Sequence, residues 1–149
     1  MSKHLISILF INFFNLTSGQ IIINEVMSKN TQTIVDQDKE YSDWIELYNN
    51  SEQTIDLEKW SITDNRKNPK KWLFPELKIK PNEYLIIWAS GKDIREKELH
   101  TNFKLKSKGE GIYLFNSSGV LIDKVPSMNI PGNHSLGKLQ GDTLKHYYF

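Results

Sequence analysis

The chain carries one cluster in which cations and an aromatic side chain stand close together. It follows Asp64 and consists of five residues, Arg66, Lys67, Lys70, Lys71 and Trp72. Closely spaced cations attract polyanions, and an indole beside them offers a stacking surface for the bases of single-stranded nucleic acid. Asn68 and Pro69 within the cluster are typical of a loop. We predict that this loop binds an anion or an anionic partner, and the alternative is a loop whose charges are only solvated.

A second group of chemically useful side chains is acidic. Asp36, Asp38 and Glu40 alternate along a polar stretch, and calcium ions bind carboxylate oxygens of this kind. An EF-hand loop that began at Asp36 would need a glycine at its sixth position and a glutamate at its twelfth, and it has neither. The stretch is therefore a weak calcium candidate, and a solvated acidic loop is the favoured interpretation. No other metal site is predicted.

Asp43 and Glu46 are the carboxylates that a small secreted hydrolase would use as a pair. Such a pair must lie a few ångströms apart. The two residues are three positions apart, however, and a regular strand would point them to opposite faces. Glu46 shares its face with Trp44 and Tyr48, so we expect it to accept a structural hydrogen bond.

The histidines and serines add no catalytic pattern. The sequence has no His-x-x-x-His or His-Glu-x-x-His pair for zinc and no Gly-x-Ser-x-Gly turn for a nucleophile. His100 is expected to be a loop residue that hydrogen-bonds the backbone. We therefore predict no catalytic residue, no cofactor and a protein that is not an enzyme.

The composition limits the choice further. A chain of 149 residues fits one domain, and 19 basic against 18 acidic residues give a formal net charge of +1. A general nucleic-acid binder would need a marked basic excess, so nucleic acid is not a predicted partner. There is no cysteine, which excludes disulfides and thiolate metal ligands.

The first 19 residues differ from the rest of the chain. A charged start at Lys3 precedes an apolar run from Leu5 to Phe14, and residues 17–19 are small. This order predicts a secretory signal peptide over residues 1–19 that is cleaved before Gln20. The run is too short for a stable membrane anchor, so we expect a secreted, periplasmic or cell-envelope protein that is not an integral membrane protein. The alternative is a buried N-terminal strand or helix.

From Gln20 onward, short β-rich segments alternate with turn residues. The predicted strands cover residues 21–26, 44–48, 54–57, 60–63, 72–74, 84–88, 111–115 and 120–123. The last two flank the turn Asn116–Gly119 and form the clearest hairpin. Asp93 to Leu99 is expected to form one or two helical turns capped by Asp93.

The recurrence of strands at intervals of roughly 8–14 residues is typical of a sandwich or barrel. We predict an all-β, antiparallel two-sheet sandwich. Alternation along residues 44–48 places Ile45 and Leu47 on one face and Trp44, Glu46 and Tyr48 on the other. The predicted core consists of Ile45, Leu47, Ile62, Leu85, Ile87, Leu114 and Ile122, with Trp60 packed between the sheets.

Nine segments in a fixed order support a family resemblance. They include Ile23-Asn24-Glu25-Val26-Met27 and Tyr41 to Asn49. The others are residues 55–64, 68–69, 72–75, 88–92, 99–105, 109–110 and 119–123. This order resembles the lamin tail domain, in the form found in exported bacterial proteins, and the similarity covers roughly residues 21–149.

The resemblance implies an immunoglobulin-like β-sandwich over residues 20–149. It also implies a non-catalytic binding, targeting or spacer module of an exported bacterial protein, with a protein, a glycan or another cell-envelope ligand as partner. The alternatives are the small secreted hydrolase and a calcium-dependent binding domain. Because the sequence stops within a β-like run at Phe149, we expect either a fragment or the leading module of a longer polypeptide.

Overall fold

The computed structural model describes residues 21–106, 108–139 and 142–149, so the predicted signal peptide lies outside the described residues. The described residues form twelve strands and no helix. The strands are β1 (Ile21–Met27), β2 (Trp44–Asn49), β3 (Ile55–Asp56), β4 (Ser61–Thr63), β5 (Trp72–Leu73), β6 (Lys78–Ile79), β7 (Tyr84–Trp88), β8 (Leu99–His100), β9 (Ile112–Phe115), β10 (Leu121–Val125), β11 (Leu136–Leu139) and β12 (Asp142–Tyr148). Accordingly, these ranges contain no helix that is long and apolar enough to cross a membrane.

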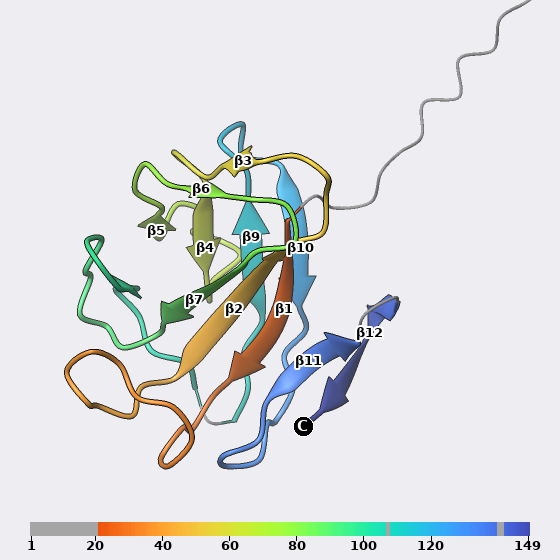
Figure 1. Cartoon of the computed structure of the whole chain (residues 1–149). Coiled ribbons are helices and arrows are strands. Elements are labelled where there is room, and N and C mark those ends of the chain that lie inside the picture. The colour runs from red at the N-terminus through yellow and green to blue at the C-terminus, as the bar shows by residue number, and fades with distance from the viewer. Residues whose placement is uncertain (1–20, 107, 140–141) are drawn as a thin grey trace, which may run out of the picture.

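Two sheets face each other (Figure 1). The larger sheet has the strand order β12-β11-β1-β2-β7-β8 and is antiparallel except between β7 and β8. The smaller sheet has the order β10-β9-β4-β5 and is antiparallel throughout. A short pair, β3 and β6, lies at the top of the molecule in Figure 1. The predicted all-β sandwich is confirmed.

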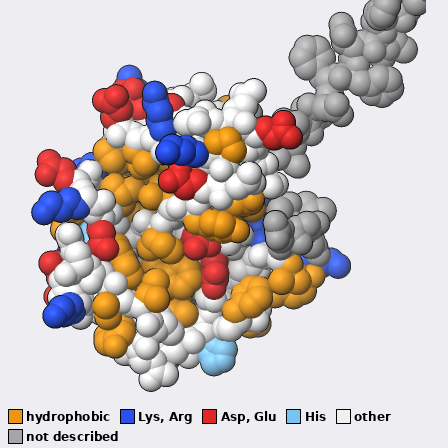
Figure 2. All heavy atoms as spheres, in the orientation of Figure 1, with side chains coloured by type: hydrophobic (Ala, Val, Ile, Leu, Met, Phe, Trp, Pro, Cys, Tyr) orange, Lys and Arg blue, Asp and Glu red, His pale blue; other side chains and the backbone are white. Residues whose placement is uncertain are grey.

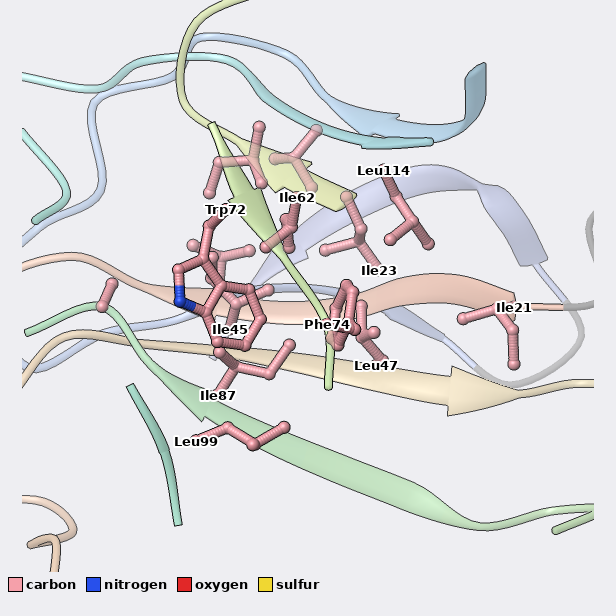
Figure 3. Close-up of a cluster of buried hydrophobic side chains, with 14 of the residues drawn as sticks. Ile21, Ile23, Ile45, Leu47, Ile62, Trp72, Phe74, Ile87, Leu99 and Leu114 are labelled. Carbon is pink, nitrogen blue, oxygen red and sulfur yellow. The ribbon is translucent and has the colours of Figure 1, made fainter. Parts of the chain in front are cut away.

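The core lies between the two sheets. The alternation predicted for β2 is confirmed, because Ile45 and Leu47 are fully buried in the main apolar cluster while Glu46 faces away from it. Figure 3 shows Trp72 and Phe74 among the side chains of the larger sheet, and their rings meet edge to face with centroids 5.0 Å apart. All eight predicted core residues belong to the cluster, Leu85 and Ile122 as partly buried members at its margin.

The predicted hairpin is also confirmed. β9 and β10 pair antiparallel around the turn Asn116–Gly119, where the Asn116 side chain accepts hydrogen bonds from the Ser118 and Val120 amides. Gly119 has a φ of 78°, a left-handed conformation that glycine adopts without steric cost. The turn residues that predict the hairpin are therefore the residues that close it.

The helical turns expected between Asp93 and Leu99 are wrong. Asp93 and Lys97 have φ values of 55° and 59°, which a right-handed helix does not allow. Instead, Ile94 and His100 exchange backbone hydrogen bonds of 3.0 and 2.8 Å, so the segment folds back on itself as an extended turn. The Asp93 carboxylate accepts the indole N–H of Trp72 at 3.1 Å and does not cap a helix.

Candidate functional site

Three segments meet at one end of the sandwich, residues 28–43, 64–71 and 89–105, and we call this region the loop end. The Gln37 amide donates to Glu98 Oε2 at 2.7 Å, which ties the first segment to the third. The Asn102 side chain donates to the Lys71 carbonyl at 2.8 Å, which ties the third segment to the second. The loops therefore support one another by contacts between residues far apart in the sequence.

Lys92 lies at the centre of the acidic segment. Its ammonium group is 2.8 Å from Glu40 Oε2, 2.9 Å from Asp38 Oδ2 and 3.0 Å from Asp36 Oδ2. The Asp36 carboxylate is fully buried and also accepts the amide N–H groups of Asp38 and Glu40. The fold of the segment 36–40 is thus held by hydrogen bonds to the buried Asp36 carboxylate and by the contacts of three carboxylates with Lys92.

The charges in this cluster shift each other's pKa values. Hydrogen bonds to Glu40, Asp38 and Asp36 raise the pKa of Lys92, although burial opposes them. Burial alone would raise the pKa of Asp36, but the amides of Glu40 and Asp38 and the Lys92 ammonium outweigh burial and lower it. Both groups are therefore held in their charged forms at neutral pH.

Asp36, Asp38 and Glu40 are the calcium candidates of the sequence. The point on which these carboxylates converge is occupied by the Lys92 ammonium, a partner that the chain itself supplies. Among the described residues, no group of three or more His, Asp or Glu side chains has the arrangement of a metal site. An internal cation thus takes the place in which the sequence suggested calcium.

Next to Lys92 lies an open groove with a volume of about 520 Å³. Its walls are formed by Glu40, Tyr41, Ser42, Asp43, Ala89, Ser90, Lys92 and Lys104. Asp43 accepts the amides of Lys29 and Asn30, at 2.6 and 3.2 Å. Burial raises the pKa of Asp43 against the effect of these hydrogen bonds and of Lys104. The exposed Tyr41 ring also lines the groove, so the groove combines positively and negatively charged side chains with an aromatic surface.

A buried polar contact joins Ser90, which lines the groove, to His100. Ser90 Oγ accepts the Lys92 amide at 3.2 Å and lies within hydrogen-bonding distance, 2.9 Å, of His100 Nδ1. Burial lowers the pKa of His100, which favours the neutral ring.

Ser90, His100 and Glu98 do not form a nucleophilic triad. His100 Nε2 has no hydrogen-bond partner among the described residues, and the Glu98 carboxylate is 3.9 Å away, beyond hydrogen-bonding distance. The expectation that His100 is a loop residue bonded to backbone is wrong: it lies in β8, is fully buried, and its ring bonds a serine hydroxyl. Its role in the structure is to join β8 to the segment that lines the groove.

The carboxylates of the hydrolase alternative belong to separate networks. Asp43 binds backbone amides in the groove, whereas Glu46 lies on the outer face of β2 and accepts the Asn24 side-chain amide at 2.7 Å. The structural hydrogen bond expected for Glu46 is therefore present. The structure does not bring Asp43 and Glu46 together as a catalytic pair.

The basic cluster is divided by the fold. Trp72 is 0% exposed and belongs to the core, so its predicted role as a stacking surface for a ligand is wrong. Lys71 forms an ion pair with Asp64 at 2.6 Å and lies 5.0 Å from the centre of the Phe103 ring, so its charge is already compensated. Arg66, Lys67 and Lys70 are exposed, and within the described ranges none of them forms an ion pair.

The segment that carries these three cations has a defined backbone. Asn65 accepts the Lys67 amide through its side chain and the Asn68 amide through its carbonyl, at 3.0 and 2.8 Å. The Thr63 hydroxyl accepts the Asn65 amide at 2.9 Å, which anchors the turn to the end of β4. The loop therefore presents its cations from consecutive hydrogen-bonded turns.

Lys92, Lys104, Tyr41 and Ser90 are site residues that the sequence does not single out. The segment 88–92 contributes only to the family resemblance, and Lys92 finds its carboxylates more than fifty positions away, at sequence separations of 54 and 56 from Asp38 and Asp36. No local pattern reports such a pairing.

A comparison with known protein families shows which family the chain is related to. The model of the Lamin Tail Domain matches residues 15–128. The chain belongs to the Lamin Tail Domain family. The matched residues include every strand from β1 to β10. A search of curated proteins finds no protein that matches this chain. Lamin tail domains are immunoglobulin-like modules that are in general not enzymes, in agreement with the sandwich described above.

Proposed function

We propose that this lamin tail domain is a non-catalytic binding module of an exported bacterial protein, and that it binds an anionic protein, glycan or other ligand of the cell envelope. The observation that carries the proposal is the set of three exposed cations, Arg66, Lys67 and Lys70, on a loop with a defined backbone. A loop that is ordered before binding loses less conformational entropy when a partner arrives.

The position of these cations also supports a binding role. Loops at the ends of a β-sandwich are the parts that core packing and sheet hydrogen bonds leave free for recognition. The neighbouring segment 101–105 links the cationic loop to the groove, because Asn102 binds the Lys71 carbonyl and Lys104 lines the groove. A partner seated on the loop can therefore extend into the groove.

The test replaces Arg66, Lys67 and Lys70 together with serine and keeps Lys71, because Lys71 pairs with Asp64. We expect the melting temperature to change by less than about 2 °C, since exposed charges contribute little to stability. Affinity for bacterial envelope fractions, and for anionic members of a glycan array, should fall at least about tenfold.

The matched control replaces three other exposed lysines, Lys80, Lys108 and Lys124, with serine, which changes the net charge equally. It should retain the affinity of the unchanged chain. Equal losses in the two variants would show a non-specific charge effect, and no loss in the first would remove the cationic loop from the proposal.

Export is a part of the proposal with its own test. The basis is the order of charged, apolar and small residues in positions 1–19. We expect mass spectrometry of protein recovered from outside the cytoplasm to show a chain that begins at Gln20. Recovery of a chain that still begins at Met1 would contradict it.

A further inference from the structure

The outer face of the six-stranded sheet, turned away from the smaller sheet, carries three rows of side chains that run across β11, β1, β2 and β7. The register of the strands defines the rows. They are Ile22–Tyr48–Tyr84, Gly137–Glu25–Glu46–Ile86 and Met27–Trp44–Trp88. A row with two carboxylates therefore lies between two rows of aromatic and aliphatic side chains. Figure 2 shows this face, with acidic side chains among hydrophobic ones.

The two carboxylates are direct cross-strand neighbours. Glu25 on β1 lies opposite Glu46 on β2, an arrangement in which like charges repel and destabilise a sheet. Their hydrogen-bond donors are uncharged: the Asn24 amide serves Glu46, and the Ser135 hydroxyl serves Glu25. In the described part of the chain no cation forms an ion pair with either carboxylate. The domain thus holds two adjacent negative charges that these residues do not neutralise.

The row of tyrosines provides an exposed ring on one side of these charges. Tyr48 and Tyr84 are stacked with ring centroids 4.5 Å apart, and Tyr84 is 53% exposed. On the other side, Trp44 and Trp88 are buried in a second apolar cluster with Met27 and Ile86, which borders the carboxylates with an apolar wall. A cation placed over the carboxylates would therefore have the exposed Tyr84 ring beside it, and an aromatic ring face attracts positive charge.

The Phe149 ring borders the row on the side of β11. Gly137 lies opposite Glu25, and a Cβ atom at this position would come within 3.1 Å of both Glu25 Cγ and Phe149 Cε2. Any larger residue would push against the carboxylate side chain and the Phe149 ring. The absence of a side chain at Gly137 therefore leaves room for this ring near Glu25.

We propose that the outer face docks a basic segment of a partner protein and holds one of its arginine side chains between Glu25 and Glu46. A planar guanidinium can donate to both carboxylates through its fork of N–H groups while its flat face stacks on an aromatic ring, a geometry that the compact ammonium of lysine matches less well. A sugar could also stack on Tyr84, but its hydroxyls would leave the repulsion between the carboxylates in place. Charge complementarity therefore favours arginine. This surface is separate from the cationic loop end and takes the opposite charge.

The pKa of Glu46 agrees with an uncompensated charge. Burial raises it, the Asn24 hydrogen bond lowers it, and the neighbouring Glu25 raises it further, with a net increase above the ordinary value.

The first experiment is an NMR titration of the full chain with two acetylated pentapeptides. One has a central arginine between leucines, and the other has citrulline, which keeps the shape but has no charge. We expect the arginine peptide to bind at least about ten times more tightly and to shift the amide signals of β1, β2 and β7. Equal affinities for the two peptides would overturn the proposal.

The second experiment removes both charges and keeps the hydrogen-bond acceptors, with the double variant Glu25→Gln and Glu46→Gln. We expect it to lose the preference for arginine and to melt at the same or a higher temperature. The control is Glu52→Gln with Glu76→Gln, two exposed carboxylates away from this face, and it should bind as the unchanged chain does. A double variant that melts at a clearly lower temperature would assign the carboxylates to stability and overturn the proposal.

Two further results distinguish this surface from the cationic loop and from a sugar-binding site. The triple serine variant of the cationic loop should retain the arginine preference, and its loss there would show that the outer face is not an independent surface. Glycan-array binding that persists in the double glutamine variant, without arginine binding by the unchanged chain, would replace the proposed partner with a sugar.

Discussion

Lys92 shows how much a single side chain can organise. Its ammonium group touches three carboxylates that come from one short segment, and one of them, on Asp36, is fully buried. The contact joins two loops that border the groove. The geometry of the groove therefore depends on a single ionic contact point.

The first prediction replaces Lys92 with methionine, which keeps the length of the side chain and removes its charge. The buried Asp36 carboxylate would then lose the cation that pairs with it, and we expect the free energy of unfolding to fall by about 2–3 kcal/mol. Urea denaturation measures this change. The control is Lys104→Met, an exposed lysine of the same groove, which should cost less than about 0.5 kcal/mol. Equal losses would contradict the central role of Lys92.

In the two-residue strand β5, adjacent side chains lie on opposite sides of the sheet. Trp72 points into the core and Leu73 points to solvent, and β5 is aligned by its pairing with β4, in which Trp72 lies opposite Ile62. We expect Trp72→Ala to cost about 3–5 kcal/mol because it leaves a cavity between the sheets. The matched change Leu73→Ala should cost less than about 1 kcal/mol, since its side chain is exposed. Thermal or urea unfolding of the two variants provides the comparison, and similar losses would place Trp72 outside the core.

The pair of carboxylates on β1 and β2 predicts a dependence of stability on pH. The pKa of Glu46 is raised above its ordinary value of 4.5, so the ionised form is the one that costs stability in the folded protein. This cost is complete above the raised pKa, decreases as the pH falls from there toward 4.5, and is absent well below pH 4.5, where the group is protonated in both states. We expect Glu46→Gln to stabilise the domain by roughly 0.2–1 kcal/mol at about pH 7 and by almost nothing at about pH 3.5. Urea unfolding at the two pH values tests it, and an equal effect at both would contradict it.

Elements that are determined by adjacent residues can be predicted from the sequence alone. The alternation in β2 and the turn chemistry of Asn116–Gly119 are properties of adjacent residues, so both predictions are confirmed. The segment 93–99 has the charge mix of a helix, but Glu98, Asp93 and Arg95 bind the Gln37 amide, the Trp72 indole and the Leu73 carbonyl. These distant partners, together with the positive φ angles, override the local preference.

The candidate site was less accessible to prediction for the same reason. The basic cluster of residues 66–72 can be recognised in the sequence, but the role of each member depends on its neighbours in three dimensions. Asp64 and Phe103 compensate the charge of Lys71, and pairing with Ile62 places Trp72 in the core. The groove and the outer face are both built from residues on separate strands and loops. Neither leaves a signal within a single segment of the sequence.

Across the domain, the two proposed binding surfaces divide the charges of a nearly neutral chain. The formal net charge of +1 conceals exposed cations on the loop 64–71 and adjacent carboxylates on the outer sheet face. On this division, the domain would bind two chemically opposite partners at once, one at the loop end and one on the sheet. A module of this kind would serve as an adaptor between them.

The strand order has a consequence for how quickly the domain can form. β1 lies in the interior of the larger sheet, yet its contact with the β11 region joins Glu25 to Ser135 across 110 positions of the chain. Closing so long a loop has a large entropic cost, and folds dominated by such contacts are slow to form. Until β11 arrives, β1 is an open edge at Glu25 and Val26, the two residues that β11 pairs, and this edge can pair with a strand of another molecule. The time between the synthesis of the first strand and that of the eleventh is therefore the interval in which this fold is most exposed to aggregation.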